Sequence, residues 1–274
     1  MTAVAVRSRR APAPLGLAAA LLALFLALPV VTLVVRAAVD GLLPAMAGSG
    51  PVISALSLSL GTTAISLVLT VSVGLPLAYV LARREFRGKW LIDTIVDLPI
   101  VLPPAVAGLA LLLVFGRRGL LGSTLETTGI ELAFTTAAVI LAQTFVSAPF
   151  FVRSARAGLG AVDRDLEDAA RVDGASERQV FTSVTMSLAA PALAAGLVMA
   201  WARALGEFGA TIMFAGNVAG RTQTLPLVVY SEFQGGDLDA SIAAAAILVV
   251  AALGVLLAVR FLHWGRALDV RTVG

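Results

Sequence analysis

Long apolar runs alternate with short polar segments along the chain. Six runs are dominated by Leu, Ala, Val and Ile, and they cover residues 15–39, 52–82, 90–115, 132–152, 188–214 and 240–264. A helix needs about 20 apolar residues to cross roughly 30 Å of hydrocarbon. The alternating ten-residue pattern of membrane β-strands does not recur in the sequence. The pattern therefore predicts an all-α protein, a polytopic membrane helix bundle with six transmembrane helices.

The residues inside these runs indicate how the helices pack. Many are Gly, Ala, Ser or Thr, which let helix backbones approach closely in lipid, so we expect a packed bundle. Pro99, Pro103 and Pro104 stand in the third run and predict a broken or kinked helix, which is tolerated where the freed backbone groups meet protein or a cavity. The first run also fits a secretory signal peptide. Its apolar stretch 15–35 is longer than a usual signal core, which favours a retained helix.

Composition supports a membrane location. Hydrophobic residues make up 59% of the chain and charged residues 14%, and the mean hydropathy is +0.95. A soluble domain carries about 25% charged residues, so we expect an integral membrane protein. The chain has no Cys, which excludes disulfides, thiolate ligands and Cys nucleophiles. The single His263 lies among basic residues and is interpreted as an interfacial residue at a helix end.

The distribution of Lys and Arg predicts the orientation of the chain. Most of these residues flank the runs on one side: Arg7, Arg9, Arg10, Arg83, Arg84, Arg87, Lys89, Arg153, Arg156, Arg164, Arg171, Arg178, Arg260, Arg266 and Arg271. The other side carries Arg36, Arg117, Arg118 and Arg221. Because basic residues mark the cytoplasmic face, both termini are expected in the cytoplasm and the chain in the plasma membrane. The basic isoelectric point of about 10.1 therefore does not indicate nucleic-acid binding.

The most polar part of the chain is the segment 163–191, called here the polar insert. Asp163 is placed to cap a short helix, and Gly174 stands where a left-handed residue ends one. Ser176 and Gln179 form a capping box that starts a second helix. The first helix has an apolar stripe at Leu166, Ala169, Ala170 and Val172, and the second has one at Val180, Phe181 and Val184. We expect two amphipathic cytoplasmic helices joined by a glycine turn. Spacing alone leaves a solvated loop and a docking element both open.

The run Asp168-Ala-Ala-Arg-Val-Asp-Gly174 resembles the EAA loop of ABC importer permeases. In that family the helix before the glycine is the coupling helix, which sits in a cleft of the cytoplasmic ATPase. The resemblance implies a type I ABC importer permease fold and a coupling loop at 158–187, with these ATPase-coupling residues: Glu167, Asp168, Ala169, Ala170 and Gly174. Asp168 stands in place of the family's Glu, with Glu167 beside it. Val184-Thr-Met-Ser187 replaces Ile-x-Leu-Pro, and the nearest proline is Pro191.

Two further stretches resemble the oxyanion (molybdate and sulfate) permeases, at residues 97–122 and 202–226. Arg117-Arg118 and the ending Gly220-Arg-Thr-Gln-Thr-Leu-Pro226 resemble the molybdate members. The resemblance implies the permease subunit of an ATP-driven molybdate importer, a homodimer that works with an ABC ATPase dimer and an extracytoplasmic molybdate-binding protein. The resemblance also implies that ATP-Mg binds to the ATPase and that this chain binds no cofactor. A sulfate, thiosulfate or tungstate permease, an ion-coupled carrier and a membrane enzyme remain alternatives.

Charged and polar residues near the last spans are candidate site residues. Arg203 and Glu207 lie four apart in the fifth run, where each buried charge costs about 2.5–3.5 kcal/mol. They are expected on one helix face, either as a locking ion pair or as a gate. The candidate pathway or gate residues are Arg203, Glu207, Asn217, Arg221, Thr222 and Gln223. Arg117 and Arg118 are candidate contacts at the outer mouth, for the oxyanion or the binding protein.

Several enzyme signatures are absent from the sequence. It contains no Gly-x-x-x-x-Gly-Lys-Ser/Thr phosphate loop, no His-Glu-x-x-His and no nucleophile–His–acid set, so we expect no catalytic residue and no metal site. The expected organisation is a cytoplasmic tail and first helix at 1–50, a five-helix ABC transmembrane type-1 core at 51–264, and a cytoplasmic tail at 265–274.

Overall fold

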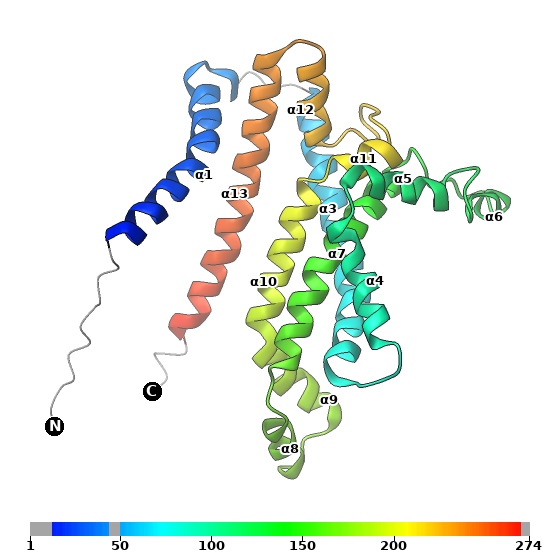
Figure 1. Cartoon of the computed structure of the whole chain (residues 1–274), viewed down its shortest axis with the longest axis vertical. Helices are drawn as coiled ribbons and strands as arrows, with labels where there is room; N and C mark the ends of the chain where they lie inside the picture. The colour runs from blue at the N-terminus through cyan, green and yellow to red at the C-terminus, as the bar shows by residue number, and fades with distance from the viewer. Residues whose placement is uncertain (1–12, 44–49, 270–274) are drawn as a thin grey trace.

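The computed structural model describes residues 13–43 and 50–269, and within them every regular element is helical (Figure 1). The predicted all-α class is therefore confirmed. The elements in chain order are α1 Ala13–Val39, α3 Gly50–Arg83, α4 Lys89–Val101, α5 Pro104–Phe115, α6 Gly122–Thr127, α7 Thr136–Gly160, α8 Arg164–Val172, α9 Glu177–Gln179, the π-helical segment η1 Val180–Thr185, α10 Met186–Leu205, α11 Gly209–Phe214, α12 Leu225–Gln234 and α13 Leu238–Asp269.

Five helices in the described residues are long and apolar enough to cross a membrane: Leu15–Val39, Gly50–Arg83, Thr136–Gly160, Glu177–Leu205 and Leu238–Leu257. A sixth span exists only if α4 and α5 are counted together, and these two helices meet at an angle of 119°. The break at Leu102 and Pro103 was predicted from the prolines and is confirmed, because neither Pro103 nor Pro104 can donate a backbone hydrogen bond. The third predicted span, at 90–115, is therefore formed by two helices, as the prolines predict.

The run 188–214 is also divided, and this break was not predicted. α10 ends at Leu205 and α11 begins at Gly209. Glu207 therefore lies between two helices, and the prediction that it shares one helix face with Arg203 is wrong. The physical reason is local: Gly206 ends α10, and the Glu207 carboxylate accepts the N–H of Ala210 at 2.6 Å, replacing a helical acceptor at the start of α11.

The predicted fourth span is shifted along the chain relative to the run 132–152. α7 begins at Thr136, because the Thr135 side chain caps it by accepting the N–H of Ala138, and it extends to Gly160. The helix thus carries Arg153 and Arg156 on its last turns. The hydrophobic run 132–152 ends before these two arginines, whereas the helix continues past them to Gly160.

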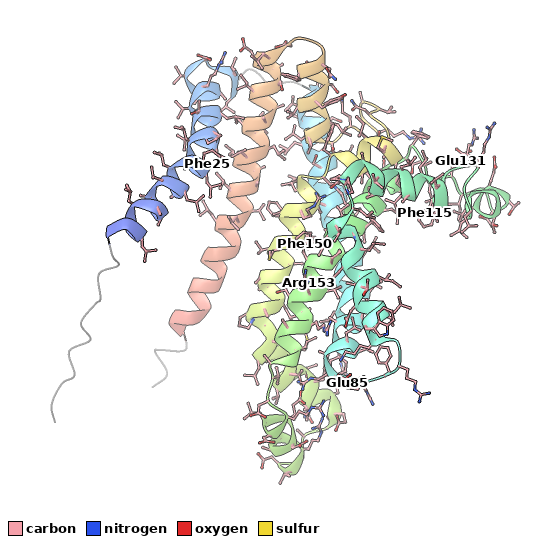
Figure 2. The ribbon with its side chains drawn as sticks, viewed as in Figure 1. Phe25, Glu85, Phe115, Glu131, Phe150 and Arg153 are labelled. Carbon is pink, nitrogen blue, oxygen red and sulfur yellow. The ribbon has the colours of Figure 1, made fainter. Side chains whose placement is uncertain are left out.

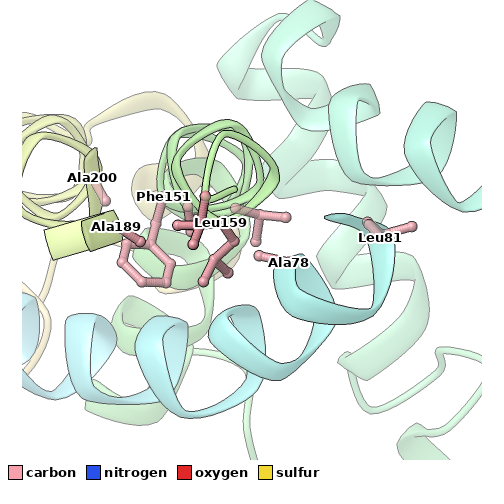
Figure 3. Packing of buried hydrophobic residues seen from close by; sticks show 9 residues of the cluster. Ala78, Leu81, Phe151, Leu159, Ala189 and Ala200 are labelled. Atoms are coloured by element: carbon pink, nitrogen blue, oxygen red, sulfur yellow. The ribbon is translucent and has the colours of Figure 1, made fainter. Parts of the chain in front are cut away.

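The core of the bundle is formed by α7 between α3 and α10. Ala78 and Leu81 of α3 pack with Phe151 and Leu159 of α7, and Ala189 and Ala200 of α10 complete this cluster (Figure 3). An added Cβ at Gly196 would lie 2.7 Å from Cβ of Ser154, so α7 and α10 approach too closely for a larger residue. Small residues thus permit close helix packing, as the sequence predicts.

The outermost helix is α1, which packs on α13 at one side of the bundle (Figure 1). No residue in its most apolar 18-residue window is buried within the protein. The opposite side carries α5 and α6, which project from the bundle. α8 and α9 lie at the end of the bundle where α3 ends, and α12 lies at the other end (Figure 1).

Some sequence predictions lie outside the described residues. These are the predictions for the tail with Arg7, Arg9 and Arg10, for Arg271, and for the side chains of Arg260, His263 and Arg266.

Candidate functional site

The first half of the polar insert forms the helix and turn that the sequence predicts. The Asp163 side chain accepts the N–H of Asp165 at 3.1 Å and caps α8. Gly174 has a φ of +91°, and the N–H of Ala175 is donated to the carbonyl of Ala170 at 3.0 Å. The left-handed glycine therefore ends α8 and satisfies its last carbonyls.

The second half of the polar insert starts as predicted but continues differently. Ser176 and Gln179 form the capping box, with the Gln179 Oε1 accepting the Ser176 N–H at 2.8 Å. The helix that begins there is not a separate short helix, because it runs without a break through η1 into α10 and spans Glu177–Leu205. Pro191 lies inside α10 and does not mark its start. The glycine turn thus connects α8 directly to a membrane span.

Glu167 is the residue that anchors α8 to the bundle. It is buried, and its Oε1 accepts hydrogen bonds from Arg83 Nη2 at 2.8 Å and from the Thr185 hydroxyl at 2.5 Å. Asp168, which stands in place of the family's Glu, has an exposed side chain. The structure therefore places Glu167, and not Asp168, at the junction of α3, α8 and η1. Sequence analysis did not identify Arg83 or Thr185 as partners, since each is far from Glu167 along the chain.

A second ion-pair group spans the glycine turn. Arg171 donates to Asp168 Oδ1 at 2.7 Å and, through Nε and Nη2, to the two oxygens of Glu177 at 2.7 and 3.1 Å. The hydrogen bonds from Arg171 lower the pKa of the Glu177 carboxyl below its ordinary value, and the hydrogen bond to Glu177 raises the pKa of Arg171. Both groups are charged at neutral pH, so they hold α8 against α9.

The outward face of α8 carries apolar side chains among charged ones, because Asp165 and Asp168 are exposed as well. Leu166 is 51% exposed and Val172 is 87% exposed, and Ala169 between them is exposed as well. Ala170 is half-buried. The apolar stripe predicted from the spacing therefore points away from the bundle, apart from Ala170. Spacing identified this stripe, but only the structure shows which way it faces.

A second candidate site lies where the two broken helices cross. Arg203 Nη1 is 2.6 Å from Glu207 Oε2, and Glu207 is 1% exposed. The ion pair considered from the sequence is therefore present, with Glu207 in the break between α10 and α11. α11 packs on α5: an added Cβ at Gly108 would lie 2.6 Å from the Ala210 carbonyl oxygen, and one at Gly209 would lie 2.6 Å from Cβ of Pro104.

The remaining candidate pathway residues belong to the loop between α11 and α12. Thr222 is buried, and its hydroxyl accepts the N–H of Val218 at 2.9 Å, so it stabilises the loop itself. Asn217 and Gln223 both donate to the hydroxyl of Ser231, at 2.7 and 3.3 Å. These contacts do not involve Arg203 or Glu207. The structure brings Asn217 and Gln223 together at Ser231, a residue that sequence analysis did not single out.

A cavity of about 210 Å³ lies beside this loop, at the base of the projecting α5–α6 arm. Arg117 and Arg221 both line it, and Arg117 pairs with Glu131 at 2.6 Å. Figure 2 shows Phe115 and Glu131 on this arm. The hydrogen bond with Glu131 raises the pKa of Arg117. Arg118 is exposed and is not among the residues that line the cavity.

Ion pairs between α4 and α7 were not anticipated from the sequence. Asp93 pairs with Arg156, and Asp97 lies 3.6 Å from Arg153; Figure 2 labels Arg153 on α7. All four residues line an open cavity of about 440 Å³ towards the α8 end of the bundle. The two acids are four residues apart on α4, and the two arginines are three residues apart on α7, so each pair lies on one helix face. This spacing predicts ion pairs only when the two helices are known to pack together.

Comparison with known proteins gives consistent matches. Residues 74–265 match the family described as binding-protein-dependent transport system inner membrane component. The molybdenum transport system permease protein ModB of Mycobacterium tuberculosis is 48% identical over 206 residues, which is 75% of this chain and 78% of that protein. ModB of Escherichia coli K12 is 42% identical over 190 residues, 68% of this chain and 83% of its own. The chloroplastic sulfate permease 2 of Chlamydomonas reinhardtii is 37% identical over 243 residues, 88% of this chain and 66% of its own.

Solved structures are similar in fold. A chain of a bacterial ABC transporter that imports the acidic polysaccharide alginate has a TM-score of 0.65 and 20% sequence identity, covering 80% of each chain. A chain of an amino acid ABC transporter crystallised with histidines has a TM-score of 0.54 and 20% identity, covering 77% of this chain and 92% of its own. At this identity the likeness concerns the arrangement of helices.

Proposed function

The chain belongs to the family of binding-protein-dependent transport system inner membrane components, and on this premise we propose that it is the permease subunit of an ATP-driven molybdate importer. The family and the apolar helices make it a multi-pass inner-membrane protein, and its fold is that of type I ABC importer permeases. The observation that carries the proposed cargo is the identity of 42–48% to molybdenum permeases over most of the chain.

The proposed energy source is a separate ABC ATPase dimer that binds ATP-Mg. The exposed stripe of Leu166, Ala169 and Val172 on α8 supports this proposal, because it offers an apolar surface at one end of the bundle. Under this proposal the permease hydrolyses nothing and binds no cofactor itself. It converts closure of the ATPase dimer into movement of its membrane helices through α8.

The proposed route for molybdate lies between two copies of the chain. The pair of Arg203 and Glu207 stands at the crossing of the broken helices, where a gate would control passage. The cavity with Arg117 and Arg221, which Glu126 and Glu131 also line, is proposed to face the molybdate-binding protein. In a related fold, the alginate transporter was crystallised with its substrate-bound periplasmic protein.

Reconstitution tests this function directly. We expect vesicles that contain this permease, its ATPase and the binding protein to take up labelled molybdate in an ATP-dependent manner, with little competition from excess sulfate. Absence of molybdate uptake in vesicles where ATP hydrolysis is stimulated by the binding protein would contradict the proposal. An inactivated ATPase serves as the control, and uptake that persists on an ion gradient alone would identify a secondary carrier.

Sulfate transport is the second candidate function. It is favoured by the 37% identity to a sulfate permease over 88% of this chain, which is a longer match than that to either molybdenum permease above. The same vesicles distinguish the two functions. Sulfate uptake that excess molybdate fails to reduce would assign the chain to sulfate.

A further inference from the structure

The buried carboxylate of Glu167 joins three elements, and this junction suggests how movement of α8 reaches the membrane. We propose that Arg83 and Thr185 are positioning residues for energy coupling, which fix α8 to α3 and to α10 at the same time. A force on α8 then displaces both helices together. The inference rests on the proposed function, in which an ATPase acts on α8.

The contact with α3 is buried and has several parts. The side chains of Arg83 and Glu167 are 9% and 11% exposed, and their charged atoms are 2.8 Å apart. Arg83 also donates through Nη1 to the carbonyl of Val162 at 3.3 Å, and its own carbonyl accepts from Arg164 Nη2 at 3.4 Å. Arg83, the last residue of α3, therefore contacts Val162 just before α8 and both Arg164 and Glu167 within α8. Separating a buried pair leaves an uncompensated charge, so α3 and α8 resist moving apart.

The contact with α10 depends on the π-helical segment η1. Thr185, the last residue of η1, is 2% exposed and donates its hydroxyl to Glu167 Oε1 at 2.5 Å. A π-helical turn holds one residue more than an α-helical turn, so it changes the direction in which Thr185 points. Phe181 of η1 meets Tyr79 of α3 edge to face, with ring centroids 5.4 Å apart. The π segment thus brings η1 against both α8 and α3.

This arrangement has a mechanical consequence for the bundle. The chain already links α8 to α10 through the Gly174 turn, and to α7 through residues 161–163. No short covalent segment links α8 to α3, so the contacts of Arg83 with Glu167 and with Arg164 supply that connection. α3 and α10 each pack along α7. When α8 moves, the junction makes α3 and α10 move as a pair on either side of α7.

The test uses the complete transporter in vesicles and measures molybdate taken up per ATP hydrolysed. We expect this ratio to fall about tenfold in Arg83→Gln and in Thr185→Val, within the range usual for coupling between sites. ATP hydrolysis and recovery of the assembled complex stay close to wild type in Thr185→Val, and Arg83→Gln, which leaves Glu167 without its cation, is measured in the complexes that assemble. Thr185→Ser keeps the hydroxyl and is expected to restore the ratio. Arg84→Gln is the matched control, because Arg84 is the adjacent arginine and is exposed.

The opposite results are equally specific. A wild-type ratio in Arg83→Gln or in Thr185→Val, in complexes that assemble normally, overturns the inference. So does an equal loss in Arg84→Gln. If the unaltered transporter takes up sulfate and not molybdate, the proposed cargo fails, but the same ratios measured with sulfate still decide whether Arg83 and Thr185 position α8.

Discussion

Gly174 has a backbone conformation that few other residues adopt. Its φ is +91°, and an added Cβ would meet no atom within 4 Å. The requirement for glycine is therefore conformational and does not come from crowding. This residue was predicted correctly from the sequence, because a helix end that needs a left-handed residue is a local property. The sequence identified Glu167 as a candidate coupling residue. It did not identify Arg83 and Thr185 as its partners, because they are distant in the chain.

Replacement of Gly174 tests the turn. We expect Gly174→Val to strain the backbone by about 1–3 kcal/mol and to abolish transport or association with the ATPase, while the membrane spans still insert. Gly174→Asn should be milder, because Asn tolerates positive φ. The control is Gly160→Val at the end of α7, where an added Cβ also meets nothing and φ is not positive. Copurification of the ATPase and molybdate uptake measure the outcome, and normal uptake by Gly174→Val would refute the assignment.

The Arg171–Glu177 contact predicts a pH dependence for the same turn. The pKa of Glu177 is lowered by hydrogen bonds from Arg171, so the carboxylate stabilises the turn above its ordinary pKa of 4.5 and loses this effect as the pH falls through the lowered value. We expect hydrogen exchange in 172–178, corrected for intrinsic rates, to be constant across neutral pH and to accelerate only in acid. Glu177→Gln should abolish the acid-dependent step. A step near neutral pH would contradict this interpretation.

At the scale of elements, the two broken helices differ in how far the sequence determines them. The break between α4 and α5 follows from Pro103 and Pro104, which cannot donate to the helix. The break between α10 and α11 has no proline, and it depends on Gly206 and on the capping contact from Glu207 to Ala210. In that contact the Glu207 carboxylate accepts a hydrogen bond in place of a helical backbone carbonyl. The spacing of apolar residues does not reveal such a contact. The crossing of α5 and α11 then requires Gly108 and Gly209.

The crossing gives a prediction about stability. Gly108→Ala places a Cβ 2.6 Å from the Ala210 carbonyl oxygen and 2.7 Å from Cβ of Met213, and the backbone oxygen cannot move without moving α11. We expect a loss of about 1–3 kcal/mol, as for other overpacked sites, seen as a lower melting temperature in detergent. Gly61→Ala in α3 is the control, because its Cβ meets nothing; it should be neutral or stabilising by about 0.5–1 kcal/mol. Equal melting temperatures would refute the close packing.

At the scale of the whole molecule, the orientation remains a prediction from Lys and Arg, and the absence of native Cys makes it simple to test. Arg87 and Thr128 are both exposed in segments on opposite predicted sides. We expect a membrane-impermeant maleimide to label Thr128→Cys in intact cells and Arg87→Cys only after the membrane is opened. The unaltered chain, which has no Cys, is the negative control for labelling. The reverse pattern would invert the proposed orientation and place α8 away from the cytoplasm.

The sequence by itself determined the helical class, the number of apolar runs, the proline break and the caps of the polar insert, because these depend on residues within a turn or two of each other. Only the tertiary structure decided that Glu167 meets Arg83 and Thr185, that Arg117 and Arg221 share a cavity, and that Asp93 and Asp97 face Arg156 and Arg153. The members of each pair lie in segments that are far apart along the chain. Their contacts depend on how the helices pack, which brings distant segments to one place and which local sequence does not determine.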